Sequence, residues 1–350
     1  MNETLFLLIE KLKYEKKLSL KEYEFLIANR TQEAVEMLRE LAVSVRQQVY
    51  GNAVFIRGLI EISNICKNNC LYCGIRKENG NVVRYRLTEE EILECCKEGY
   101  ELGFRTFVLQ GGEDGYYTDE VLCNLISAVK NRYPKCAVTL SLGERSRDSY
   151  QKLFAAGADR YLLRHETADE SHYGILHPTE LSYEKRMRCL QDLKDIGYQT
   201  GCGFMVGSPY QTTKHLAKDL KFIEEFGPDM CGIGPFIPAK GTPFEKLEAG
   251  TLELTCYLLS IIRLIRPNIL LPSTTALGTI DPKGREMGIL AGANVVMPNL
   301  SPASVRKKYR LYDNKVSDGA ESAQSRQILT EKMHAIGYQV VIDRGDIKKN

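Results

Sequence analysis

The chain has 350 residues, of which 43% are hydrophobic and 26% are charged, and its formal net charge is +2. This composition is typical of a soluble globular protein, and the length suits two average domains or one α/β barrel. The chain has no concentrated basic stretch, which argues against binding to nucleic acid. It also has no long apolar run and no signal-peptide pattern, which argues against a membrane span and against export.

The cysteine content points to a reducing compartment. The chain has 11 cysteines, an odd number, and most of them stand singly in apolar periodic segments. A disulfide framework is therefore not expected. We expect a cytoplasmic protein.

Residues 3–49 show the pattern of two helices that are separated at Asn29-Arg30-Thr31. Thr31 suits the N-cap of the second helix, because its hydroxyl can accept a hydrogen bond from the first turn. We expect both helices to close the bottom of the domain that follows, rather than to face a partner.

From residue 53 onwards, short runs of strand-forming residues alternate with longer segments of helical period. Glycine ends several helical segments, as in Ala156-Gly157-Ala158, which is typical of a return from helix to strand. Short crossovers make the strands parallel, so the pattern predicts a (β/α)8 barrel of the TIM type, with a doubly wound open sheet as the alternative. The strand candidates are 53–63, 106–110, 137–141, 160–163, 201–206, 230–234, 269–273 and 294–297. The clearest helical patterns are 88–102, 121–132, 183–196, 214–226 and 251–265.

No linker or change in composition argues for a second large domain. We therefore divide the chain into an N-terminal helical extension (1–50), the barrel (51–312) and a short C-terminal extension (313–350).

Cys66, Cys70 and Cys73 form a C-x3-C-x2-C motif directly after the first strand candidate. Three thiolates on one short loop can each ligate one iron of a cubane cluster, and they leave the fourth iron open. Three structural cysteines are one alternative. A structural zinc site is another, but it requires a fourth ligand, for which Cys95 or Cys96 could serve.

With Tyr72 just before its last cysteine, this motif resembles the signature of the radical S-adenosylmethionine (SAM) superfamily. The resemblance implies an enzyme with one [4Fe-4S] cluster that cleaves SAM reductively into methionine and a 5′-deoxyadenosyl radical. It extends to Gly111-Gly112-Glu113, which implies binding of the methionyl amine, since glycines admit a ligand and a carboxylate meets an ammonium. It also extends to the segments 203–207 and 232–238, where Met205 and Ile233 would lie beside the adenine.

A closer resemblance, to the HydE family of iron–iron hydrogenase maturases, covers residues 50–312. The segments that carry it are 84–86, 109–114, 139–144, 157–167, 232–238, 274–279 and 292–298. The resemblance implies that Glu166 and Arg186 contact SAM, with the arginine pairing with the SAM carboxylate. The role of His165 stays open. The implied substrate cavity inside the barrel is lined by Gln110, Arg160, Thr274, Thr275, Met297, Tyr309 and Tyr312.

Arg160 also has a physical argument of its own, because a charge near the barrel interior is costly unless it holds an anionic group. Thr274 and Thr275 end a strand candidate, where hydroxyl and N–H groups can bind an anion.

The resemblance implies a maturase that helps to build the diiron subcluster of iron–iron hydrogenase. The implied substrate is a small cysteine-bound iron carbonyl cyanide complex from a partner maturase, and the implied electron donor is of the ferredoxin or flavodoxin kind. Some members of the family carry a second cluster on three C-terminal cysteines. Residues 315–325 contain serines and no cysteine here, so we expect one cluster only. Whether this departure marks a paralogue with a different substrate is left open.

Two other functions stay open. One is another radical SAM enzyme, such as a methylornithine synthase-like mutase or the maturase of a different hydrogenase. The other is an iron–sulfur carrier or scaffold, which needs the three cysteines but not the SAM-binding residues. A Glu113→Ala exchange separates them, because only an enzyme loses SAM cleavage.

Overall fold

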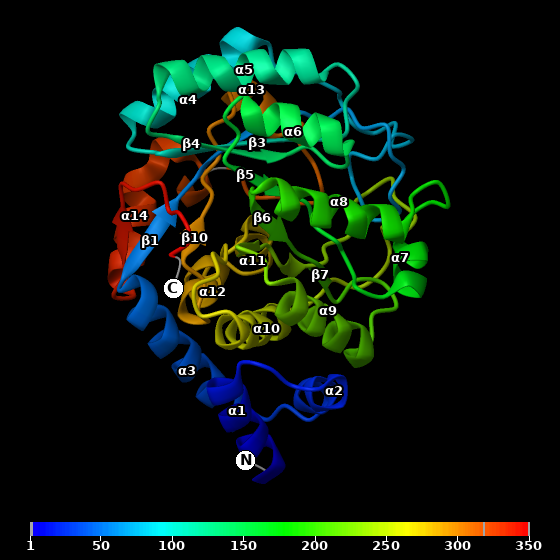
Figure 1. Ribbon diagram of the computed structural model, residues 1–350, viewed down its shortest axis with the longest axis vertical. Helices are drawn as coiled ribbons and strands as arrows, with labels where there is room; N and C mark the ends of the chain where they lie inside the picture. The colour runs from blue at the N-terminus through cyan, green and yellow to red at the C-terminus, as the bar shows by residue number, and fades with distance from the viewer. Residues whose placement is uncertain (1–2, 318, 349–350) are drawn as a thin grey trace.

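Parallel strands form a ring at the centre of the molecule, and helices surround it (Figure 1). The computed structural model describes residues 3–317 and 319–348. Within these ranges, a six-stranded parallel sheet makes up most of the ring. Its strands, in spatial order, are β2 (Gly58–Ser63), β3 (Thr106–Gly111), β4 (Ala137–Ser141), β5 (Arg160–Leu162), β6 (Gln199–Cys202) and β8 (Met230–Cys231).

Two further chain segments complete the ring. Leu270 bridges to β8, and Pro272 bridges to β10 (Val295–Val296). Asn299 then bridges back to Leu59 of β2. All of these bridges are parallel, so the described residues close a ring of eight members. The predicted (β/α)8 barrel is confirmed, and the alternative of an open sheet is wrong.

Helices connect successive strands, and local sequence sets their ends. Thr88 caps α4 in a capping box with Glu91, whose N–H donates to the Thr88 hydroxyl at 3.2 Å. Gly197 ends α8 in the left-handed conformation. The helices are α4 (Glu89–Glu101), α5 (Asp119–Arg132), α6 (Arg147–Ala155), α7 (Glu170–Leu176), α8 (Tyr183–Ile196), α9 (Thr213–Phe226), α10 (Leu252–Ile265), α11 (Thr275–Ile280) and α12 (Gly284–Leu290). Two short strands, β7 (Met205–Val206) and β9 (Gly234–Pro235), pair in parallel beyond β6 and β8.

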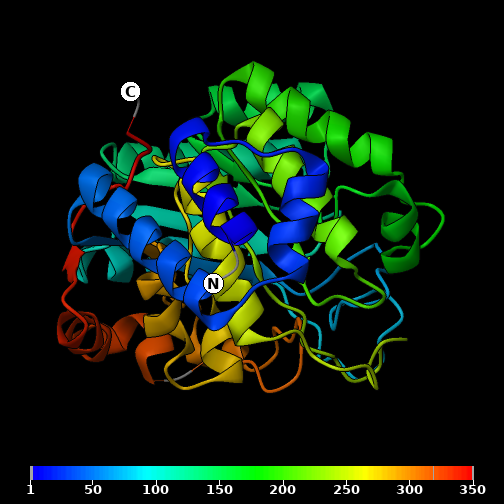
Figure 2. The same cartoon turned by 90° about the horizontal axis from the view of Figure 1, so that it is seen from below.

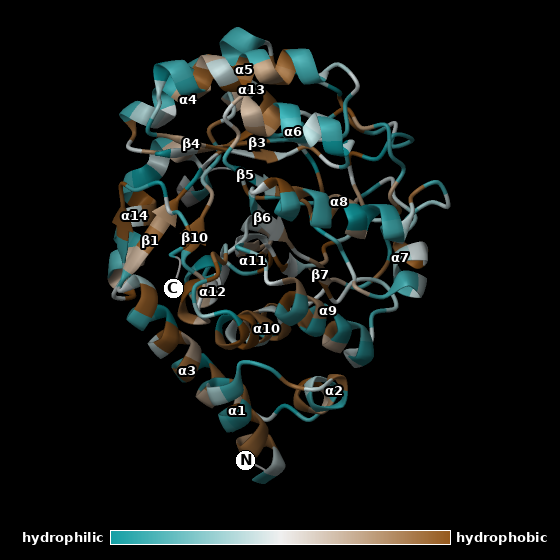
Figure 3. Cartoon of the chain, viewed as in Figure 1, coloured by the Kyte–Doolittle hydropathy of each residue, from teal (hydrophilic) through white to brown (hydrophobic). Residues whose placement is uncertain are grey.

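The visible side of α10 is largely hydrophobic (Figure 3), and most of its residues are apolar. All residues from Tyr257 to Ile265 are buried. The reason is that α3 (Gln32–Tyr50) packs on the outer side of α10, while the inner side joins the barrel core. A helix that is hydrophobic on all sides is stable when it is covered on all sides.

The described N-terminal residues form three helices, where the sequence pattern predicted two: α1 (Glu3–Glu15), α2 (Leu20–Ala28) and α3. The additional break arises because Ser19 caps α2 in a capping box with Glu22. The expected break near Thr31 is confirmed, and Thr31 caps α3. Only the end of α3 reaches the bottom of the barrel, where Tyr50 packs with Met230 and Leu270. Otherwise α2 packs against α9 and α3 packs against α10, on the outside of the helical layer (Figure 2).

The C-terminal segment returns to the bottom of the barrel, where the strands begin. There β11 (Gln339–Val341) pairs in parallel with β1 (Ala53–Ile56), which leads into β2 and also pairs with β10. The segment before β11 contains α13 (Ala303–Arg306), two 3-10 turns (Gly319–Glu321 and Ala323–Ser325) and α14 (Arg326–Ala335). None of the helices in the described ranges has the length and apolar character that crossing a membrane requires.

Candidate active site

A cavity of about 330 Å³ lies at the carboxyl ends of the barrel strands, where barrel enzymes assemble their active sites. Its wall combines the cysteine motif with residues from most of the strand ends. The sequence-predicted residues that line it are Cys66, Cys70, Tyr72, Cys73, Gln110, Gly111, Gly112, Glu113, Glu166, Arg186, Met205, Thr274, Thr275, Met297, Tyr309 and Tyr312. Arg160 and Ile233 are not among the lining residues.

One arginine holds the cysteine loop in place. Arg84 Nη1 donates to the carbonyl oxygen of Asn64 at 2.6 Å, and Nη2 donates to that of Arg76 at 2.6 Å. Within the motif, the Cys73 N–H donates to the Cys70 carbonyl oxygen at 3.3 Å. The guanidinium satisfies several carbonyl groups at once, so the loop keeps a fixed shape without regular secondary structure.

Burial controls the chemistry of the three thiols. It raises the pKa of Cys66 and Cys70, and it raises the pKa of Cys73 to about 12. The free thiols are therefore protonated at neutral pH, and coordination to a metal is what removes such protons. Among the described residues, no three His, Cys, Asp or Glu side chains converge as the ligands of one metal ion do. A cubane cluster needs no such convergence, because each thiolate ligates a different iron, so these cysteines fit a cluster better than a single zinc ion.

Gly112 allows the end of β3 to pass close to the cysteine loop. A Cβ atom on Gly112 would lie 2.3 Å from the Ile65 carbonyl oxygen and 2.7 Å from Cys66 Cβ. The next N–H group, that of Glu113, donates to the Cys66 sulfur at 3.4 Å. This glycine is therefore required by contact between two protein segments, whereas the motif alone predicted an approach to the ligand.

The carboxylate of Glu113 is held from two sides. Its Oε1 accepts the N–H of Glu144 at 2.9 Å, and its Oε2 lies 3.2 Å from Lys67 Nζ. Gly143 makes this position accessible, because a Cβ atom there would lie 2.2 to 2.5 Å from side-chain atoms of Glu113. The carboxylate thus has a defined orientation in the cavity wall.

Glu166 has a strained backbone at the mouth of the barrel. Its φ of 66° is in the left-handed region, which residues other than glycine rarely occupy outside functional sites. Its N–H donates to the Gly203 carbonyl oxygen at 2.9 Å, which holds this conformation. The buried Oε2 has no hydrogen-bond partner within the described residues, and Arg164 Nη2 lies 3.4 Å from it. This oxygen has an ion pair with Arg164 but no hydrogen bond, so it can still accept one from a ligand in the cavity.

Arg186 is fixed by the residue that also fixes Glu113. Its Nε donates to Glu144 Oε1 at 2.7 Å, and its Nη1 donates to the Arg164 carbonyl oxygen at 2.7 Å. Glu144 therefore couples the guanidinium on α8 to the end of β3. The guanidinium is preorganised, which suits bidentate recognition of a carboxylate.

Two buried histidines support this wall, and the sequence assigned a role to neither. His177 Nδ1 lies 3.0 Å from the Tyr173 carbonyl oxygen, so we place the proton on Nδ1, and Nε2 accepts from the Tyr72 hydroxyl at 3.3 Å. Burial lowers the pKa of His177 to about 3, which keeps the ring neutral. His165 does not line the cavity; its Nδ1 accepts the Gly203 N–H at 3.3 Å, and its Nε2 lies 3.2 Å from Asp219 Oδ1.

A second charged pair on the cavity wall was missed at the level of sequence. Lys315 Nζ contacts Glu61 Oε1, and Asn299 Nδ2 donates to Glu61 Oε2 at 2.8 Å. Beside this pair, Gln110 Nε2 donates to the Tyr309 hydroxyl at 3.4 Å. Glu61 is the single acid in the apolar run 53–63, and that anomaly was the available signal.

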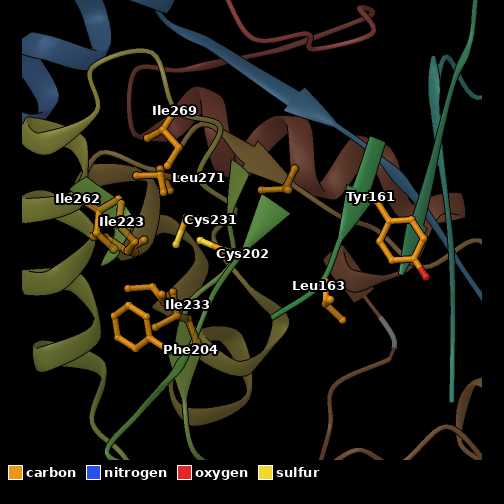
Figure 4. Packing of buried hydrophobic residues seen from close by; sticks show 14 of the residues in the cluster. Tyr161, Leu163, Cys202, Phe204, Ile223, Cys231, Ile233, Ile262, Ile269 and Leu271 are labelled. Atoms are coloured by element: carbon orange, nitrogen blue, oxygen red, sulfur yellow. The ribbon is translucent and has the colours of Figure 1, made fainter. Parts of the chain in front are cut away.

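Two predicted residues lie elsewhere. Arg160 is fully buried at the start of β5, at the opposite end of the barrel, where it pairs with Asp346 and donates to the Arg344 carbonyl oxygen at 2.9 Å. Its buried charge does have an anionic partner, but that partner is the tail of the chain. The side chain of Ile233 packs in the hydrophobic core with Phe204 (Figure 4), and only its neighbours line the cavity.

The fold and the site together define a class. Residues 60–223 match the family model of the Radical SAM superfamily, and the protein is a radical SAM enzyme, a class that implies SAM and a [4Fe-4S] cluster. The chain is 47% identical over 281 residues to the "[FeFe] hydrogenase maturase subunit HydE" of Thermotoga maritima, with 80% of each chain covered. It belongs to the HydE family of this superfamily.

The chain is also similar to proteins outside the HydE family. It is 31% identical over 297 residues to the 3-methylornithine synthase of Methanosarcina acetivorans, which covers 84% of this chain and 83% of that one. The crystal structure of methylornithine synthase (PylB) matches with a TM-score of 0.83 at 27% identity, over 95% of this chain and 97% of that chain. The barrel is therefore shared beyond the HydE family.

Proposed function

We propose that this protein is a maturase of iron–iron hydrogenase that acts through radical SAM chemistry. The observation that carries the proposal is that the cysteine motif and the residues shared with the HydE family line one cavity. The identity of 47% to a maturase subunit supports this choice of reaction.

In this proposal, Cys66, Cys70 and Cys73 hold one [4Fe-4S] cluster. When bound, the cluster and SAM supply a carbon-centred radical through one-electron cleavage of the sulfonium. Arg186 presents its oriented guanidinium to the SAM carboxylate, and Glu113 presents its carboxylate to the SAM ammonium. The buried Oε2 of Glu166 is available to accept a hydrogen bond from SAM. Tyr72, Gly111, Gly112, Met205 and the backbone around Ile233 complete the proposed SAM site.

The substrate in this proposal is a cysteine-bound iron carbonyl cyanide complex from a partner maturase. It would occupy the part of the cavity lined by Gln110, Thr274, Thr275, Met297, Tyr309 and Tyr312. The buried Oγ1 of Thr274 has no hydrogen-bond partner among the residues described, and a hydroxyl in that state can donate to an anionic ligand.

The proposal also includes a single cluster, because residues 315–325 contain no cysteine. Reconstituted protein is then expected to bind about four iron atoms per chain, and a Cys66→Ala, Cys70→Ala, Cys73→Ala variant is expected to bind none. All 11 cysteines are free in the structure, which is compatible with a reducing compartment. The proposal further includes a cytoplasmic location and an electron donor of the ferredoxin or flavodoxin kind. The division at residues 50 and 312 remains part of the proposal.

The test is anaerobic maturation of apo hydrogenase in vitro, in which this protein replaces the HydE component. Hydrogen evolution above that of the variant without the three cysteines is expected. A protein that forms 5′-deoxyadenosine from SAM but matures no hydrogenase would have another substrate.

The second candidate is a mutase of the methylornithine synthase kind, which the TM-score of 0.83 favours. In that case SAM cleavage depends on a free amino acid rather than on the partner maturases. A Glu113→Ala variant excludes the scaffold alternative if it binds iron but forms no 5′-deoxyadenosine.

A further inference from the structure

Two groups of charged side chains line the cavity, and the proposed SAM site uses only one of them. That group contains Glu113, Glu166 and Arg186. The second group is the ion pair of Glu61, on β2, with Lys315, in the segment that follows α13. In the ring, β2 lies next to β3, which leads to Glu113, while β3 and β4 separate β2 from β5, which leads to Glu166, so the second group stands on a strand that carries no member of the first.

The second pair is buried but still faces the cavity. The side chain of Glu61 is inaccessible, and that of Lys315 is 9% exposed. A buried ion pair contributes little to stability, because the desolvation of both ions offsets their attraction. An ion pair in a cavity wall can instead bind a charged ligand. Folding has already removed the solvent from both ions, so ligand binding does not have to remove it.

Both ions keep binding capacity. The lysine ammonium has three donors, and within the described residues it meets Glu61 Oε1 and the Tyr309 carbonyl oxygen, the latter at 3.3 Å. The carboxylate has about four lone-pair positions, and it accepts from Lys315 and from Asn299. One donor and two acceptor positions are therefore unused by the protein; the lysine donor opens onto the cavity, and the positions on the inaccessible Glu61 become available when the Lys315 ammonium turns towards the ligand.

We infer that Glu61 and Lys315 bind the α-ammonium and the α-carboxylate of an amino-acid substrate. A ligand with a single charge would be attracted by one ion of the pair and repelled by the other. A zwitterion places an opposite charge beside each ion, and the Tyr309 hydroxyl and the Gln110 amide, which lie next to the pair, add neutral hydrogen-bonding groups. The inference rests on the proposed function, in which the substrate carries a cysteine, and it identifies the part of the substrate that the protein recognises.

A purely structural role for the pair makes a different prediction. Lys315 could simply tie the C-terminal segment to β2, and its loss would then weaken the fold and every ligand equally. A binding role changes the preference between ligands that differ in one charged group. Discrimination between such ligands therefore decides between the two roles.

The test uses S-methyl-L-cysteine, 2-(methylthio)ethylamine, which lacks the carboxylate, and 3-(methylthio)propionate, which lacks the ammonium. Their affinities are measured by anaerobic titration calorimetry on the reconstituted protein, with saturating S-adenosylhomocysteine in the SAM site. The wild-type protein should bind the zwitterion about 10- to 100-fold more tightly than either fragment. Lys315→Met should lose the preference over the amine, and Glu61→Gln should lose the preference over the acid, while each keeps the other preference.

Matched variants keep the test sharp. Lys332 forms an ion pair with Glu286 at 3.1 Å in the same C-terminal extension, and Lys332→Met should change none of the three affinities. Lys315→Arg should restore the preference, because it returns the charge. If Lys315→Met does not fold, discrimination by the wild-type protein and by Lys315→Arg still tests the inference.

The inference is overturned if the wild-type protein does not prefer the zwitterion, or if Lys315→Met weakens all three probes equally. If the protein matures hydrogenase but does not prefer the zwitterion, the inference is wrong and the proposed function stands. If the protein prefers the zwitterion but does not mature hydrogenase, the proposed function is wrong. The protein is then a radical SAM enzyme that acts on another amino acid.

Discussion

A Gly143→Ala exchange tests whether the position of Glu113 controls SAM binding. The glycine has a φ of 74°, and an added Cβ would lie 2.2 to 2.5 Å from the Glu113 side chain. Gly197 is the matched control, because its φ is 106° while the nearest atom to an added Cβ is Phe154 Cζ at 3.7 Å. Both exchanges strain the backbone, and only the first displaces the carboxylate.

The two effects have different magnitudes. Placing alanine in a left-handed conformation costs about 1–2 kcal/mol at either position. At Gly143 the carboxylate must also leave the Glu144 N–H, to which it bonds at 2.9 Å. A hydrogen bond to a charged group contributes about 1.5–3 kcal/mol, and loss of the same amount of SAM affinity raises the Kd by about 10- to 150-fold.

The assay compares the SAM affinity and the urea unfolding of both variants on reconstituted protein. Gly197→Ala should lose stability but keep the wild-type affinity for SAM, whereas Gly143→Ala should lose both. Equal SAM affinity in the two variants would refute the assignment of Glu113 as a SAM ligand, because its carboxylate would then have moved without consequence.

Three further predictions follow from the same contacts. Gly112→Ala should abolish iron binding, because the added Cβ displaces the cysteine loop. Gly115→Ala is the control and should bind iron normally, because no atom lies within 4 Å of an added Cβ there. Iron analysis after reconstitution measures both. His177→Gln should make the free energy of unfolding less dependent on pH. In the folded protein the His177 ring is protonated only near pH 3, whereas in the unfolded chain it takes up a proton below about pH 6.5. The wild-type protein therefore loses stability as the pH falls. Between pH 7 and pH 5 the wild-type protein should lose about 2 kcal/mol more than the variant in urea unfolding, and identical pH slopes would contradict this. Asp346→Asn should destabilise the fold by about 1–3 kcal/mol, less than for a fully buried pair because Asp346 is partly exposed, and an unchanged urea midpoint would show that Arg160 does not need its partner.

The sequence predicted the barrel and most of the cavity wall because those features depend on local patterns. Strand candidates alternate with helical segments, and a cysteine motif or a Gly-Gly-Glu run can be recognised without knowing what packs against it. The parts that failed depend on contacts between distant segments. Arg160 was assigned to the cavity because its charge needs an anionic partner, and the partner is on the tail, 186 residues further along the chain.

The same limit explains the residues that were not foreseen. Glu144 ends one of the segments that carried the resemblance, but neither it nor His177 was given a role, because their importance comes from the side chains that they orient. Glu61 and Lys315 are 254 residues apart, so nothing in either local sequence indicates that they meet. The break before α2 is a different case, because the Ser19 capping box was present in the sequence and was overlooked.

The ring closes between Leu59 and Asn299, and this has a consequence for synthesis of the protein on the ribosome. The cysteine loop emerges within the first quarter of the chain, whereas the segments that complete its surroundings emerge near the end. Contacts of such long range form only after the intervening chain is available, and domains of this kind fold late. A factor that delivered iron during translation would therefore meet the cysteine loop before the barrel around it is complete. After release it meets a loop that is already walled in by the barrel, so the timing of metal loading relative to chain completion becomes a variable in producing the active protein.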